Sequence, residues 1–102
     1  MIRHTVVFRL RHDAGSTEEQ DFLAAAQALA AIPGVRAFEQ LRQTSAKNAF
    51  TFGLSMEFAD EEAYAGYDAH PVHRAFVEQR WVPEVADFLE IDYVPLERRD
   101  QT

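Results

Sequence analysis

Two imidazoles and a phenol lie close together in the segment 67–73, YDAHPVH, which contains Tyr67, His70 and His73. Proline disfavours the helical conformation in the residue before it, and it is well tolerated at the first position of a helix. We therefore predict that one helix ends near Ala69 and that another begins at Pro71. His73 is then the third residue of the second helix, where unpaired backbone amides disfavour a positive charge on the imidazole. A neutral imidazole in this position can act as a general base.

Tyr67 and His73 are the candidate catalytic residues of the chain. The imidazole could accept a proton from a carbon next to a carbonyl group, while the phenol donates a hydrogen bond to the developing enolate or alkoxide. This chemistry needs no cofactor, and we predict none. The alternative hypothesis is structural: Tyr67 buries its ring and pairs its hydroxyl with His73 or with backbone, which joins two helices to a sheet.

Two other histidines have alternative roles. His70 can cap the helix that begins at Pro71, or it can join His73 in a metal site. Zinc sites have three or four ligands and the chain has no cysteine, so His4 would have to be the third ligand, and we predict no metal site. His4 lies on the apolar face of the first predicted strand, either as a core histidine with a hydrogen-bond partner or as a polar wall of a pocket.

Aromatic side chains are the remaining candidates for ligand contact. Phe52, Phe76 and Trp81 belong to an aromatic set that can line a cavity, although such residues more often form plain core. The predicted ligand-binding residues are therefore His4, Phe52, His70, Phe76 and Trp81.

The size and composition of the chain indicate one folded domain. It has 102 residues, of which 47% are hydrophobic, and it contains eight phenylalanines. This is ample material for a core in a domain of this length. We predict a single domain over residues 1–96 and a frayed tail over residues 97–102.

The charge of the chain excludes several classes of partner. The formal net charge is -7 and the isoelectric point is near 4.9, whereas nucleic acids and anionic membranes attract clustered Lys and Arg. No apolar run approaches the roughly 20 residues that cross a bilayer, and the first residues lack a signal-peptide pattern. With no cysteine present, we expect a cytoplasmic protein that binds neither nucleic acid nor membrane.

Hydrophobic periodicity predicts the elements that position these residues. Alternation predicts strands over residues 2–10, 35–43, 50–58 and 88–94, and the second of them has a weak pattern that allows a bulge. Ser16 and Glu19 form a capping-box pattern for a helix that Pro33 ends. The helix beginning at Pro71 has apolar residues at helical spacing up to Val85, and Pro83 should kink or shorten it.

The predicted order is strand, helix, strand, strand, helix, helix, strand. It suggests an α+β fold in which a four-stranded antiparallel sheet carries its helices on one face. The open face would present apolar residues that a small monomer does not leave in water, so we predict a homodimer that packs sheet against sheet. These residues are Val7, Phe38, Leu89, Ile91 and Tyr93.

The chain resembles the stress-responsive dimeric α/β-barrel family, often called Dabb domains. The matching segments cover nearly its whole length: MIRHTVVFRL at 1–10, IPGV at 32–35, EFADEEA at 57–63, YDAHPVH at 67–73 and DY at 92–93. The resemblance implies a ferredoxin-like protomer whose sheet packs against that of a second copy to make a barrel.

The resemblance also implies candidate activities. Most bacterial members have no assigned role, whereas one plant member is a polyketide cyclase that forms olivetolic acid by intramolecular aldol condensation. Its catalytic tyrosine and histidine match Tyr67 and His73, and a pocket histidine matches His4. Phe52 stands where that cyclase has a second pocket histidine, which implies a more apolar pocket. The two functions implied are a cofactor-free cyclase or isomerase for a small apolar carbonyl or phenolic compound, and a non-catalytic dimeric stress-associated domain.

Overall fold

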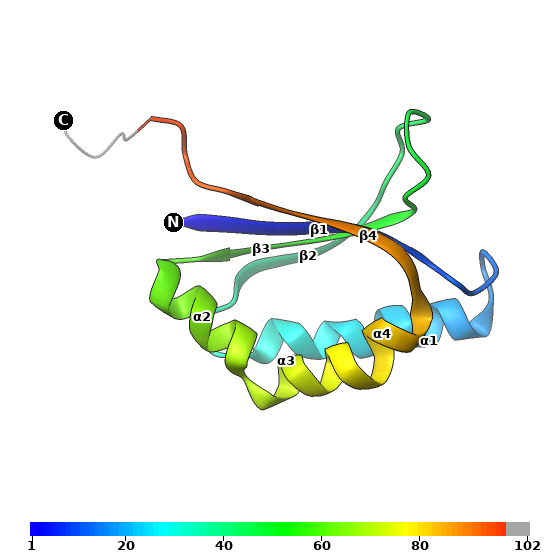
Figure 1. Ribbon diagram of the computed structural model, residues 1–102, viewed down its shortest axis with the longest axis horizontal. Coiled ribbons are helices and arrows are strands. Elements are labelled where there is room, and N and C mark those ends of the chain that lie inside the picture. The colour runs from blue at the N-terminus through cyan, green and yellow to red at the C-terminus, as the bar shows by residue number, and fades with distance from the viewer. Residues whose placement is uncertain (98–102) are drawn as a thin grey trace.

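The computed structural model describes residues 1–97, in which a four-stranded antiparallel sheet carries helices on one face (Figure 1). The strands lie in the order β2-β3-β1-β4. Their bounds are β1 Ile2–Leu10, β2 Arg36–Arg42, β3 Phe52–Phe58 and β4 Val85–Tyr93. The predicted order of strands and helices is confirmed. The predicted tail, residues 97–102, lies outside the described residues except for Glu97.

The first two helices begin after a polar cap residue, and the first of these caps is the predicted Ser16. Ser16 accepts a hydrogen bond from the Glu19 amide, and Asp60 accepts one from the Ala63 amide, so both supply partners for helix-start amides that lack one within the helix. The helical elements are α1 Thr17–Ala26 with the 3₁₀ turn η1 Gln27–Ala31, α2 Glu61–Ala69, α3 Pro71–Phe76, the π turn η2 Val77–Trp81, and α4 Val82–Glu84. No helix among residues 1–97 is both long and apolar enough to span a bilayer. The cytoplasmic location stays a prediction.

Strand β2 contains a bulge, which its weak pattern allowed, and the bulge corrects one assignment. Its pairing with β3 shifts register between Arg36 and Glu39, and Ala37 has a positive φ of 52°. The extra residue turns Phe38 toward the helices, where it packs against the core. Phe38 therefore does not lie on the open face, as the simple alternation predicts, and Leu41 is exposed in this strand instead.

The last helical segment ends earlier than predicted. Pro83 lies within the first two positions of α4, which ends at Glu84, and Val85 already has extended backbone with φ -90° and ψ 124°. Val85 is thus the first residue of β4 rather than a helical residue, and the strand begins three residues before the predicted Phe88. Its side chain is nevertheless buried, as the helical spacing required.

The two faces of the sheet have different surroundings. The helix-covered face holds the core, in which Phe8, Phe22 and Phe58 are fully buried. On the other face, where Figure 1 shows no covering element, the alternation of β4 leaves Leu89 51% exposed and Ile91 38% exposed. Of the five residues predicted for the open face, four lie on it, and Phe38 is the exception.

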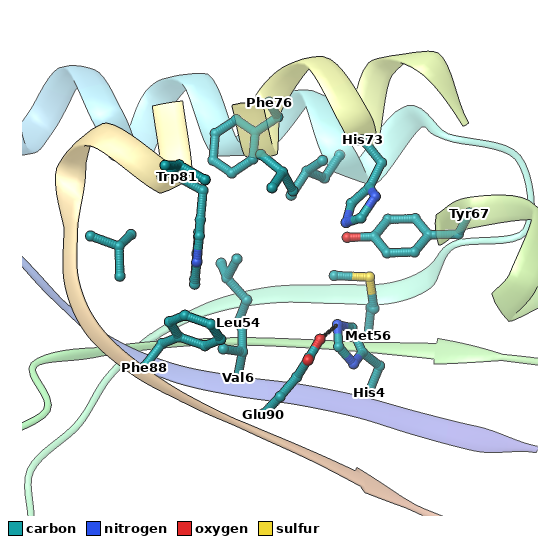
Figure 2. A pocket seen from close by; sticks show the side chains of 14 residues that line it. His4, Val6, Leu54, Met56, Tyr67, His73, Phe76, Trp81, Phe88 and Glu90 are labelled. Atoms are coloured by element: carbon teal, nitrogen blue, oxygen red, sulfur yellow. Dashed lines mark ion pairs between the residues drawn. The ribbon is translucent and has the colours of Figure 1, made fainter. Parts of the chain in front are cut away.

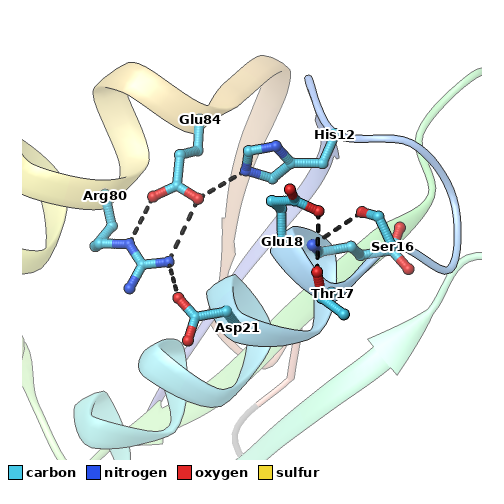
Figure 3. A network of polar contacts seen from close by, with 8 residues as sticks. His12, Ser16, Thr17, Glu18, Asp21, Arg80 and Glu84 are labelled. Atoms are coloured by element: carbon cyan, nitrogen blue, oxygen red, sulfur yellow. Dashed lines mark hydrogen bonds and ion pairs between the residues drawn. The ribbon is translucent and has the colours of Figure 1, made fainter.

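A polar network ties the last helical turns to the start of α1 (Figure 3). Glu84 accepts hydrogen bonds from the Arg80 guanidinium and pairs with Nε2 of His12 at 2.7 Å, while Arg80 also donates to Asp21 at 2.8 Å. The bond from Arg80 lowers the pKa of the Glu84 carboxyl, and His12 acts in the same direction against the effect of burial. The network holds the loop after β1 against the helical layer.

Glu84→Gln should lower the free energy of unfolding at pH 7 by about 1.5–3 kcal/mol, the range for hydrogen bonds to charged groups. Because folding lowers the pKa of Glu84, its ionised form contributes stability above the unfolded value of about 4.3 and loses it as the pH falls through the folded value. Denaturant unfolding should therefore show a smaller difference in the free energy of unfolding between the original chain and Glu84→Gln at pH 3 than at pH 7. Glu78→Gln, at an exposed position of η2, is the control and should change little at either pH.

Candidate functional site

A cavity of about 460 Å³ lies between the sheet and the helical layer. Most of its wall is apolar and comes from β1, β3, β4 and the helices after Pro71. The polar side chains gather toward one end, as Figure 2 shows, and they are His4, Tyr67, His73 and Glu90. An apolar cavity with a few converging polar groups is the usual form of a small-molecule site.

Tyr67 comes from α2 and is only 2% exposed. Its ring lies between the two imidazoles, with centroid distances of 4.5 Å to His73 and 6.1 Å to His4. Burial raises the pKa of the phenol well above its ordinary value, and the charges of Asp68 and Glu90 add to this effect. No hydrogen bond of the hydroxyl is present among residues 1–97, although the structural hypothesis predicts one with His73 or backbone, and the hydroxyl is open to the cavity because no fully buried polar side-chain atom there lacks a partner. The phenol is protonated and can donate to a ligand oxygen.

His73 lies at the third position of α3, where the sequence predicts it. Its Nδ1 is 2.9 Å from the carbonyl oxygen of Asp68, and because a carbonyl only accepts, Nδ1 must carry the proton. In the neutral ring this leaves the lone pair on Nε2, and the nearest carboxylate oxygen, Oδ1 of Asp68, is 3.9 Å from it. The ring can therefore accept a proton at Nε2.

Nδ1 of His4 contacts two polar groups, one from Asp92 and one from Tyr64. Its Nδ1 is 2.6 Å from Oδ1 of Asp92 and 2.9 Å from the hydroxyl of Tyr64, and that hydroxyl donates to Oδ2 of Asp92 at 2.8 Å. Nε2 has Glu90 as a neighbour at 3.8 Å, which is too long for a hydrogen bond. His4 is 5% exposed and lines the cavity, so both sequence hypotheses apply to it.

Sequence reasoning missed three polar residues of this site: Glu90, Asp92 and Tyr64. A signal for the first two was present in the alternation of the last strand, because residues that alternate with exposed Leu89, Ile91 and Tyr93 must face the helices. Tyr64 belongs to α2 and stacks on Phe58 with a centroid distance of 5.0 Å.

Two predicted ligand-binding residues do not line the cavity. Phe52 faces the core but pairs with Phe8, at the opposite end of the strand pairing from His4, and the Arg42 guanidinium lies 5.2 Å from its ring. His70 caps α3 by accepting a hydrogen bond from the Val72 amide. The other three, His4, Phe76 and Trp81, do line it. The role of each stays a prediction.

The part of the chain that the structure describes contains no group of three or more His, Asp or Glu side chains placed to hold a metal ion. The cavity itself offers acid and base groups together with apolar surface. Such an arrangement can bind an oxygen-bearing ligand and transfer protons.

Comparison with protein families gives a match over residues 2–95 to the model described as Stress responsive A/B Barrel Domain, or Dabb. A solved structure of a Dabb family protein with a ferredoxin-like fold from Mesorhizobium loti is 62% identical. It has a TM-score of 0.93 and covers 94% of this chain and 97% of its own.

Two further relatives are more distant. A dimeric ferredoxin-like protein of unknown function from Thermobifida fusca is 25% identical, with a TM-score of 0.76 and coverage of 92% of this chain and 90% of its own. A stress-response A/B barrel domain-containing protein of Arabidopsis thaliana is 30% identical over 96 residues, which are 92% of this chain. The chain spans only 36% of the length of that plant protein.

Proposed function

The chain belongs to the stress-responsive A/B barrel domain family, and from its cavity we propose that it binds a small, largely apolar compound with a carbonyl or phenolic oxygen. The observation that supports this most directly is the Tyr67 hydroxyl, which is protonated and without a protein partner among the described residues at the polar end of an apolar cavity. Such a donor binds a ligand oxygen, and the apolar wall binds the rest of the compound.

The same groups support proton abstraction without a cofactor. Nε2 of His73 takes a proton from the carbon next to the carbonyl, the electrons of that C–H bond form the enolate, and Tyr67 donates to the enolate oxygen. The enolate can then attack a second carbonyl in the same molecule, which is an aldol cyclisation, or it can be protonated elsewhere, which is an isomerisation. Catalytic roles for Tyr67 and His73 are part of this proposal.

We also propose that the chain is a homodimer through the open sheet face. Three observations support it: exposed Leu89 and Ile91 are adjacent positions of one face, no helix among residues 1–97 covers that face, and the similar Thermobifida fusca protein is dimeric. The dimer is also the basis of the second candidate function, a non-catalytic stress-associated domain. In that case the cavity residues only stabilise the fold.

Ligand binding can be measured through Trp81, because it is the only tryptophan and it lines the cavity. Titration with 4-nitrophenol should quench its fluorescence to saturation. Tyr67→Phe removes the donor and should weaken binding about tenfold, which corresponds to ~1.4 kcal/mol for one buried hydrogen bond. Tyr93→Phe, the same change on the open face, is the control and should bind like the original chain.

The pH range of binding provides a separate check with a ligand that does not ionise, such as acetophenone. The raised pKa of Tyr67 keeps its donor proton bound above the ordinary tyrosine value of about 10. Binding should therefore persist through pH 10. If neither probe affects Trp81, or if Tyr67→Phe changes only the melting temperature, the non-catalytic function is supported instead.

A further inference from the structure

The two imidazoles of the cavity have different hydrogen-bond partners at Nδ1. Nδ1 of His73 donates to a neutral backbone carbonyl, whereas Nδ1 of His4 donates to the carboxylate of Asp92 at 2.6 Å. A carboxylate in this position fixes the tautomer and the orientation of the ring, and it stabilises the imidazolium formed when the other nitrogen takes a proton. Of the two cavity histidines, His4 is the one with this arrangement.

The position of Asp92 is itself constrained. The Tyr64 hydroxyl donates to its second oxygen at 2.8 Å, and burial together with that bond raises the pKa of Tyr64, which therefore stays a donor. Tyr64 is held in turn by stacking on Phe58. Both oxygens of Asp92 thus have a partner, and Nε2 of His4 is the ring nitrogen left for the cavity.

We propose that His4 is a second proton-transfer residue of the site, which exchanges a proton with the ligand oxygen, and that Asp92 and Tyr64 are its positioning residues. This inference rests on the proposed function. With a phenol, the O–H bond breaks, its electrons stay on oxygen and the proton binds Nε2, which gives a phenolate beside an imidazolium. With an aldol substrate the direction is reversed, and the protonated His4 donates to the alkoxide that cyclisation produces.

This assignment divides the chemistry between two groups on opposite sides of Tyr67. His73 removes the proton from carbon, Tyr67 donates to the oxygen, and His4 transfers the proton to or from that oxygen. Glu90, with a carboxylate oxygen 3.8 Å from Nε2 of His4, provides a second negative charge beside the imidazolium. The substrate class that this arrangement fits is a carbonyl compound with an acidic α C–H and a largely apolar body.

4-Nitrophenol distinguishes the roles of the two histidines because its absorbance separates the phenol from the phenolate. At a pH below the titration of the free compound, the bound compound should ionise in the original chain and in His73→Gln. In His4→Gln it should remain a phenol. Asp92→Asn should lower the phenolate-to-phenol ratio of the bound compound at least tenfold, and Tyr64→Phe should lower it less. Asp87→Asn, which removes a carboxylate from the same strand, is the control and should leave the ratio unchanged.

A measurement on the original chain tests the proposal even if the variants do not fold. Ring ¹⁵N shifts of His4 in the original chain should show protons on both nitrogens once 4-nitrophenol binds, while His73 keeps one. The proposal is overturned if bound 4-nitrophenol ionises in His4→Gln but not in His73→Gln. It is also overturned if 4-nitrophenol binds to the original chain without ionising. An absence of any binding at Trp81 instead contradicts the proposed function itself.

Discussion

Leu89→Glu should convert the proposed homodimer into a monomer at micromolar concentration. Leu89 lies next to Val7 in the pairing of β1 with β4, at the middle of β4, and Ile91 extends the apolar surface along the same strand. A glutamate there would place an unpaired charge between two sheets. Such a charge costs about 3–5 kcal/mol, so the dissociation constant should rise about a hundredfold to several thousandfold.

Sedimentation across a range of concentrations measures this effect directly. Val72→Glu is the matched control, because Val72 is 41% exposed on the helical layer and should tolerate a charge without a change in mass. The secondary structure of Leu89→Glu should be unchanged by circular dichroism, since the residue contributes to the open face and not to the core. A monomeric original chain would contradict the dimer, and so would a Leu89→Glu variant that remains dimeric.

The central strands of the fold could be predicted from the sequence because each has one apolar face. In β1 and β3 the alternating residues enter one core, so strand period alone assigns their direction. The bulge in β2 could be suspected but not placed, since nothing about Ala37 indicates a positive φ of 52°. Phe38 was assigned to the wrong face for that reason.

The candidate site divides in the same way. Tyr67 and His73 follow from local chemistry, because Pro71 sets the boundary between two helices and thereby the positions of both side chains. The partner of His4 cannot be predicted from local chemistry. Asp92 is 88 residues away from His4, and its position depends on the register of β1 with β4. For Phe52, the strand period correctly predicts that the side chain faces the helices. Its distance from the site cannot be predicted, because it depends on where along β3 the cavity lies.

Phe22→Ala should destabilise the domain by about 3–5 kcal/mol, the range for removing a buried phenylalanine. Phe22 is fully buried on α1, and its ring lies 5.8 Å from Phe8, 5.4 Å from Phe76 and 6.1 Å from Trp81. It therefore joins the helical layer to the sheet, and the space left by its removal cannot be filled without moving several rings. Denaturant unfolding measures the loss, which is a large part of the roughly 5–15 kcal/mol that stabilises a domain.

The same substitution links the core to the cavity. Phe76 and Trp81 line the cavity and pack against Phe22, so the loss of that ring should loosen the apolar wall and weaken 4-nitrophenol binding even where the domain remains folded. Leu96→Ala removes a large apolar side chain from a fully exposed position and should change stability by less than about 0.5 kcal/mol. If Phe22→Ala were as mild as this control, Phe22 could not be the packing contact that supports the wall of the cavity.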